Sequence, residues 1–332
     1  MNVDKKLRLF RQHFFSRRSH SKLTGKFLRT RKLIAKSIPR GFRKLVPESI
    51  AKHLYFSGVI SLRRSDTHVC YVWNHSDLEN SMYWGGGEIS YGREGLTLDL
   101  FTTLIENVNL NSFLDGGANS GTFGLICLGS KTTINSVIFA EPFPSALELL
   151  HKNLLVNPKL LQQGKRVEVL EGALGKFDGA ADLYFDPNKS MQFSATLEES
   201  FHLNNSASLK VDCLKMSTFI KRKRIEPPDI VKLDIEGAEY SALLGFEEYL
   251  RNIKFLFVEI LKDKNAIELS ELFDKSSYLF VDIDDARKGL RFIPVLGSSS
   301  YRNVLIFQKT YLEQVSMCIN QIAGNMIKKK QK

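Results

Sequence analysis

Apolar and polar residues follow two different periods along the chain. From residue 111 onward, short apolar runs are separated by stretches in which apolar residues recur every three or four positions. The apolar runs predict strands at 112–115, 136–140, 167–171, 229–233, 255–260, 278–283 and 303–308. The stretches between them predict helices at 122–129, 144–156 and 240–250, and one that includes 269–273. Seven strands alternating with helices predict an α/β fold with a mostly parallel sheet and helices on both faces.

The pattern is weaker upstream of this domain. A helix is predicted over 96–108, where four apolar residues are spaced by four, namely Leu96, Leu100, Leu104 and Val108. A weak alternation predicts a strand at 68–73, and a short helix is expected at 48–56. Residues 65–110 therefore form a lead-in segment to the domain.

Composition favours a folded globular chain. Of the 332 residues, 43% are hydrophobic and 25% are charged, which argues against a disordered chain or a collagen-like repeat. The four cysteines, Cys70, Cys127, Cys213 and Cys318, form no CxxC pair. A zinc site is therefore not expected, and a reducing compartment is the default.

Charge divides the chain into unequal parts. Residues 1–64 carry 18 lysines and arginines but two acids, whereas residues 65–327 carry 25 basic and 34 acidic residues. Leu7, Phe10 and Phe14 share one face of a possible helix in residues 1–45. Four interpretations of this leader, residues 1–45, remain open. It contacts an anionic membrane surface, it is a solvated tail, it is a mitochondrial transit peptide, or it is an arm that binds nucleic acid. We expect a cytoplasmic protein, which the first of these interpretations would associate with a membrane, or a mitochondrial one if the source is eukaryotic.

A glycine-rich turn follows the first predicted strand of the domain. It reads Asp115-Gly116-Gly117-Ala118-Asn119-Ser120-Gly121. In a parallel sheet, ligands bind at the carboxyl ends of the strands, and glycines let a ligand approach the backbone. An acid at Asp115 would repel a phosphate, so the turn favours a cationic, phosphate-free ligand such as a sulfonium amino acid joined to a nucleoside. The alternative interpretation is that the glycines only allow close packing of the turn and that it binds no ligand.

Acidic residues also end the following strands. Glu141, before Pro142, can accept hydrogen bonds from two ribose hydroxyls. Glu171 could accept from an exocyclic amine, or be a solvated acid. The fourth strand ends in Asp234, with Glu236 and Glu239 shortly after it. Several carboxylates at one strand end are typical of a functional site, although acids at a helix N-terminus are also common.

Taken together, these motifs resemble a known family. The segments that carry the resemblance are 114–121, 139–142, 171–175, 231–239 and 258–259, with a lead-in at Gly92-Arg93-Glu94. In this order they are similar to the FkbM-type S-adenosylmethionine-dependent methyltransferases. The resemblance covers about half of the chain and implies the Rossmann-like class I methyltransferase fold.

The resemblance also implies an activity and a site. The family acts chiefly on hydroxyls of sugars and natural products, so O-methylation with S-adenosylmethionine is expected. The implied cofactor-binding residues are Glu94, Asp115, Gly117, Asn119, Gly121, Glu141, Pro142, Glu171, Ala173 and Asp234. Glu236 is the first candidate for the catalytic base, with Glu239 second, and Asp234 faces the methionine amino group or the reacting centre. No metal is expected.

Two other enzyme classes are disfavoured. A Rossmann-type NAD oxidoreductase would carry GxGxxG, which is missing here. A nucleic-acid methyltransferase using the basic leader is disfavoured because the fourth strand ends in Asp234-Ile235-Glu236-Gly237 rather than an Asn/Asp-Pro-Pro-aromatic motif. A non-catalytic scaffold at a membrane is argued against by the intact cofactor-site residues.

The chain is thus divided into four parts. They are a basic extension (1–64), the lead-in (65–110), a methyltransferase domain (111–310), and a C-terminal helix with a basic tail (311–332). The acceptor is a small molecule or glycan, and no specific nucleic-acid partner is expected. An apparent loop or hairpin at 186–205 is a candidate wall for that acceptor, or a solvated insertion. The oligomeric state is not predicted.

Overall fold

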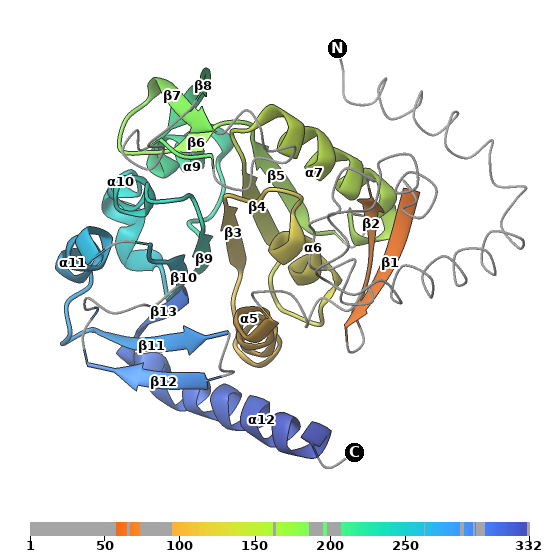
Figure 1. Ribbon diagram of the computed structural model, residues 1–332, viewed down its shortest axis with the longest axis vertical. Coiled ribbons are helices and arrows are strands. Elements are labelled where there is room, and N and C mark those ends of the chain that lie inside the picture. Colours follow the sequence, from red (N-terminus) through yellow and green to blue (C-terminus); the bar gives the residue numbers. More distant parts are fainter. Residues whose placement is uncertain are drawn as a thin grey trace, which may run out of the picture.

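An eight-stranded sheet forms the centre of the molecule (Figure 1). Its order is β12-β11-β13-β10-β9-β3-β4-β5. The strands are β3 (Ser112–Gly116), β4 (Ser136–Ala140), β5 (Arg166–Leu170), β9 (Ile230–Leu233), β10 (Phe255–Glu259), β11 (Tyr278–Asp284), β12 (Gly289–Ile293) and β13 (Asn303–Gln308). The computed structural model describes residues 58–64, 67–73, 95–161, 164–185, 195–197, 207–261, 263–285, 289–294, 296 and 303–330.

The sheet has the topology of a class I methyltransferase. Strands β5, β4, β3, β9 and β10 are parallel, and β13 lies antiparallel between β10 and β11. All seven expected strands are present, and β12 adds an eighth, antiparallel strand at the edge. The chain passes from β3 to β4 on one side and returns to β9 on the other, so the sheet reverses its order between β3 and β9. Such a reversal opens a crevice at the carboxyl ends of the strands.

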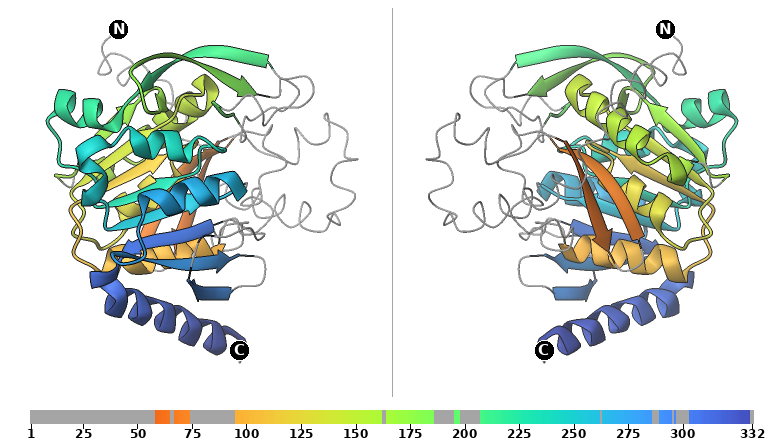
Figure 2. Two further views of the ribbon diagram at one scale, coloured as in Figure 1. Left: turned by 90° about the vertical axis from the view of Figure 1, so that its left-hand side faces the viewer. Right: turned by 90° about the vertical axis from the view of Figure 1, so that its right-hand side faces the viewer.

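Helices cover both faces of this sheet (Figure 2). They are α5 (Gly95–Asn107), α6 (Thr122–Gly129), α7 (Pro144–Val156), α8 (Pro158–Leu161), α9 (Met216–Lys223), α10 (Glu239–Leu244), α11 (Asp263–Leu272) and α12 (Leu312–Lys330), with short 3-10 helices η5 (Glu247–Asn252) and η6 (Lys309–Tyr311). Because side chains alternate along a strand, Phe113 belongs to an apolar core that includes residues of α5, α6 and α12, whereas Leu114 belongs to a core that includes residues of α9, α10 and α11 on the other face. Each face therefore has its own apolar core.

One predicted helix is wrong in its extent. The sequence predicts a single helix over 240–250, but α10 ends at Leu244 and η5 follows after Gly245. A Cβ at Gly245 would lie 2.1 Å from the carbonyl oxygen of Gly175, so the backbones approach closely there. Apolar spacing carries no sign of this contact between distant segments.

Two smaller sheets lie outside the central one. Strands β1 (Gly58–Arg64) and β2 (Thr67–Trp73) form a hairpin against α6 and α7. Strands β6 (Ala173–Leu174), β7 (Gly179–Phe185) and β8 (Ala207–Leu214) form a three-stranded sheet beyond β5, which the sequence pattern does not predict. The expected strand near residue 68 is confirmed as β2.

Several expectations fall outside the described residues. They concern the leader 1–45, the short helix 48–56, Glu94, and most of the acceptor loop 186–205. In the part of the chain that is described, no helix is both long and apolar enough to cross a membrane.

Candidate cofactor and active site

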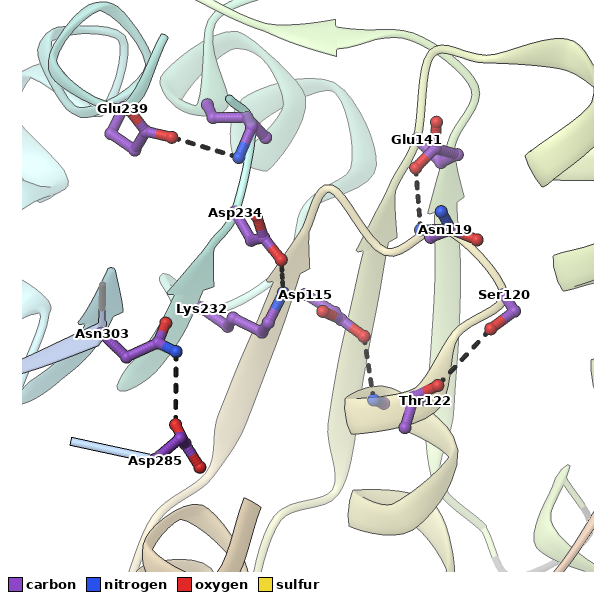
Figure 3. A network of polar contacts seen from close by, with 12 residues as sticks. Asp115, Asn119, Ser120, Thr122, Glu141, Lys232, Asp234, Glu239, Asp285 and Asn303 are labelled. Carbon is purple, nitrogen blue, oxygen red and sulfur yellow. Dashed lines mark hydrogen bonds and ion pairs between the residues drawn. The ribbon is translucent and has the colours of Figure 1, made fainter. Parts of the chain in front are cut away.

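The carboxyl ends of β3, β4 and β9 bring together three of the predicted acids. Asp115 lies near the end of β3, Glu141 directly after β4, and Asp234 directly after β9. Figure 3 shows them around the turn that joins β3 to α6, with Lys232 between Asp115 and Asp234. This cluster lies where the sheet reverses its order, which is the expected position of a ligand site.

The turn between β3 and α6 has a backbone that only certain residues adopt. Gly117 and Gly121 have φ angles of 70° and 84°, and Asn119 has a φ of 49°. A Cβ on Gly117 would lie 1.9 Å from the carbonyl oxygen of Asp234. Glycine is therefore required at this position, both for its left-handed conformation and for the close approach of two strand ends.

Two buried oxygen atoms in this turn lack a donor. Asp115 is 1% exposed, and its Oδ2 accepts from the backbone N–H of Gly124 at 2.9 Å. Its Oδ1 and the Oδ1 of Asn119 have no hydrogen-bond partner within the described part of the chain. A buried acceptor without a donor is costly, so these atoms are suited to take hydrogen bonds from a ligand.

Glu141 holds the turn against the end of β4. Its Oε2 accepts from the N–H of Asn119, and its Oε1 from the N–H of Phe143, both at 2.8 Å. Burial raises the pKa of Glu141 to about 7 despite these two hydrogen bonds. Each carboxylate oxygen keeps a further lone pair, so Glu141 can also accept hydrogen bonds from a ligand.

Asp234 is held by a residue that the motif analysis did not single out. Lys232 is 6% exposed, and its Nζ lies 3.2 Å from Asp234 Oδ2 and 4.9 Å from the centre of the Phe123 ring. Burial raises the pKa of Asp234, but the Lys232 charge and a hydrogen bond with Glu259 outweigh it and leave the pKa below its ordinary value. A lysine within the otherwise apolar strand Ile230–Leu233 was the available signal.

Glu236 and Glu259 complete an acidic group beside Asp234. One carboxylate oxygen from each of the three lies within 4.8 Å of the others, and all three residues are half-buried. Glu236 has a φ of 54°, and its carbonyl oxygen accepts from the Thr196 hydroxyl at 2.7 Å. This arrangement places carboxylates at the ends of β9 and β10, where they could accept a proton. The same oxygens are spaced closely enough to contact a cation.

Glu239, the second candidate base, is bound to backbone N–H groups of the loop before α10. It is fully buried, and its Oε1 accepts from the N–H groups of Ile235 and Gly237 at 3.2 and 3.1 Å. Burial raises its pKa to about 7. These contacts favour a structural role in shaping the loop before α10.

The residues predicted at the adenine end lie farther along the sheet edge. The Glu171 side chain is 63% exposed and lies 2.9 Å from His151 Nε2. Ala173 is buried in the core of the small sheet, with Leu183 and Val211, so only its backbone is available to a ligand. Pro142 is half-buried between Glu141 and α7.

The buried carboxyl groups give the ligand-free protein a defined pH dependence. Burial raises the pKa of Asp115 from 3.8 to about 6, although Lys232 and the Gly124 hydrogen bond lower it. The native state therefore binds this proton more tightly than the unfolded state, and the stability it contributes is lost as pH rises from about 4 to about 6.

We expect Asp115→Asn to remove that contribution. The difference in free energy of unfolding between wild type and Asp115→Asn should change by up to about 3 kcal/mol between pH 4 and pH 7, as measured by urea denaturation. Asp178→Asn is the control, because hydrogen bonds from Lys215 and Thr218 lower the pKa of Asp178, so its pH-dependent contribution changes below about pH 4 and its effect between pH 4 and pH 7 should be small and of opposite sign. A pH-independent difference for Asp115→Asn would contradict the assignment.

The comparisons with known proteins point to one family of methyltransferases. A model of the methyltransferase FkbM domain matches residues 115–292, more than half of the chain. The hexuronic acid methyltransferase AglP of Haloferax volcanii is 22% identical over 179 residues, covering 54% of this chain and 68% of AglP. Methyltransferase sdnD of Sordaria araneosa is 28% identical over 170 residues, covering 43% of this chain and 64% of sdnD.

A solved structure of the same family is also similar. The crystal structure of methyltransferase FkbM from Methylobacillus flagellatus KT aligns with a TM-score of 0.39 and 14% identity, covering 70% of this chain and 53% of that one. The family match spans the glycine turn, Glu141 and the end of β9, whereas the lead-in at Gly92-Arg93-Glu94 lies outside it. The chain belongs to the FkbM family of methyltransferases.

Proposed function

We propose that the protein transfers a methyl group from S-adenosylmethionine to a hydroxyl oxygen of a sugar, a glycan or a natural product. The observation that carries this proposal is the pair of buried acceptor atoms, Asp115 Oδ1 and Asn119 Oδ1, in the glycine turn beside Glu141. The family membership supports the methyl-transfer chemistry, and the cofactor and the acceptor atom are inferred from the site.

The residues of the turn fit the parts of this cofactor. Asp115 and Asn119 offer acceptors to the ammonium group of the methionine moiety, and Gly117 lets the turn pack directly against the Asp234 carbonyl. Glu141 has lone pairs left for the two ribose hydroxyls. In our proposal, Glu171 accepts from the exocyclic amine of adenine. When bound, the cofactor supplies an electrophilic methyl group on a positively charged sulfur.

The acidic group at the ends of β9 and β10 borders the acceptor half of the crevice. A hydroxyl has a high pKa, so a nearby base helps to remove its proton as the new bond forms. In our proposal, Glu236 takes that proton while the acceptor oxygen bonds to the methyl carbon, and the electron pair of the broken bond stays on sulfur. Asp234 and Glu259 orient the acceptor hydroxyl.

The acceptor class rests on the family and on one relative. AglP is described as a hexuronic acid methyltransferase, which makes a sugar hydroxyl the first acceptor to test. Incubating the protein with methyl-labelled S-adenosylmethionine and a panel of glycans, lipid-linked sugars and polyketides tests the proposal. Mass spectrometry should find the label on an oxygen of at least one panel member, and label on nitrogen or carbon would contradict O-methylation.

Glu141→Ala should weaken binding of S-adenosylmethionine by about 1–3 kcal/mol, the range for losing hydrogen bonds to a charged group. The loss combines the ribose contacts with the N–H groups of Asn119 and Phe143 that order the turn. Isothermal titration calorimetry measures it. Glu148→Ala on α7 is the control, because the Glu148 side chain is 67% exposed and pairs with Lys152. Equal affinities for wild type and Glu141→Ala would move the ribose contact elsewhere.

A further inference from the structure

Lys232 is a buried cation in the floor of the proposed site. Most of its neighbours along β9 are apolar, and it is paired in register with Asp115 on β3. Its ammonium group lies 3.2 Å from Asp234 Oδ2, so it is located between two acids that border the crevice (Figure 3). The proposed mechanism gives this residue no role.

The charge of Lys232 acts at short range and with little screening. The residue is 6% exposed, and the ring of Phe123 lies beneath its ammonium group. Lys232 is the cation that lowers the pKa of Asp115, of Glu141 and of Asp234. Charge interactions in such a partly buried site are several times stronger than in water.

This position matters because the proposed reaction removes a positive charge. S-adenosylmethionine carries a sulfonium, and its demethylated product S-adenosylhomocysteine carries a neutral sulfur. A floor of carboxylates alone would bind the cationic cofactor more tightly than the transition state, in which that charge is already disappearing. Binding energy of this kind lowers turnover, because it stabilises the ground state more than the transition state.

We propose that Lys232 is a positioning residue whose positive charge offsets the negative charges of Asp115 and Asp234. Without this charge, the site would bind the cationic cofactor much more tightly than the transition state or the neutral product. This inference rests on the proposed use of S-adenosylmethionine. A purely structural role, in which Lys232 only pairs with Asp234, would change stability without changing that preference.

The test is the ratio of two dissociation constants, that of S-adenosylhomocysteine divided by that of S-adenosylmethionine, measured by calorimetry. Lys232→Met keeps the length of the side chain and removes its charge. It should raise the ratio about tenfold, the size expected for one unit charge at about 10 Å and intermediate dielectric. It should also lower both KM for the cofactor and kcat, the pattern expected when ground-state destabilisation is removed.

Lys254→Met is the matched control. Lys254 also pairs with a carboxylate, at 2.9 Å from Asp229 Oδ1, but it lies at the amino end of β10, on the opposite edge of the same sheet. The ratio of dissociation constants for Lys254→Met should stay within about twofold of wild type, because the charge of Lys254 is far from the site and is screened. If the ratio for Lys232→Met also stays within about twofold of the wild-type ratio, the proposal is overturned.

Two further measurements test the proposal if Lys232→Met fails to fold. Lys232→Gln keeps a hydrogen-bond donor for Asp234 and should raise the ratio in the same direction. Wild type itself should bind S-adenosylhomocysteine at least as tightly as S-adenosylmethionine, and a strong wild-type preference for S-adenosylmethionine would contradict the role of Lys232. If wild type binds neither ligand, the proposed function fails instead.

Discussion

Glu236→Gln should lower turnover by about 10²–10⁴-fold, the range for losing a general base. The substitution keeps the shape of the side chain but removes the carboxylate that receives the hydroxyl proton. Glu236 is half-buried and lies beside Asp234 and Glu259, where the proposed mechanism places the acceptor hydroxyl. The affinity for S-adenosylmethionine should change little, because the methionine and ribose contacts are assigned to other residues. Single-turnover kinetics with a saturating cofactor measures the effect.

Glu239→Gln is the matched control for this prediction. A single oxygen of Glu239, Oε1, accepts from both Ile235 and Gly237, and the amide oxygen of glutamine can accept from the same two N–H groups. Turnover of Glu239→Gln should therefore stay close to wild type. If Glu236→Gln is active and Glu239→Gln is not, the base is Glu239, and Glu236 only complements the helix dipole.

Gly117→Ala should destabilise the protein by about 3 kcal/mol or more and abolish cofactor binding. The new Cβ would lie 1.9 Å from the Asp234 carbonyl oxygen, and the φ of 70° is itself unfavourable for alanine. Relief of the clash must separate the glycine turn from the end of β9, and these two segments together form the site. Urea denaturation and calorimetry measure the two effects.

Gly164→Ala separates the clash from the backbone strain. Gly164 has a φ of 72°, but no atom lies within 4 Å of a Cβ placed there. It should cost about 1–2 kcal/mol from the left-handed conformation alone and leave cofactor binding unchanged. Similar losses in the two variants would mean that the turn and the end of β9 are not in close contact.

Much of this fold follows from patterns within single segments. The bounds of α6, α7, β4 and β13 match their predicted ranges residue for residue, because each is a compact apolar or amphipathic segment with clear punctuation such as Pro144. The positions of Asp115, Glu141 and Asp234 at the strand ends follow from the same segmentation, since parallel strands bring their carboxyl ends to one edge.

Other features depend on contacts between distant segments. The break at Gly245 arises from the approach of Gly175, and the sheet β6-β8-β7 is built by pairing across residues 186–206. The burial of Lys232 and the orientation of Glu239 toward backbone amides are properties of the assembled loop. The sequence indicates which residue types are present, but not which carboxylates are satisfied by N–H groups and which remain open to a ligand.

The turn from Asp115 to Gly121, with Glu141, is the part of the molecule that we propose binds S-adenosylmethionine. A calorimetric titration of the 332-residue chain with S-adenosylmethionine, S-adenosylhomocysteine and NAD tests this binding. We predict saturable binding of the first two, with one molecule per chain, and no binding of NAD. Folded protein that binds neither S-adenosylmethionine nor S-adenosylhomocysteine, or that binds NAD in their place, would show that this turn is not an S-adenosylmethionine site.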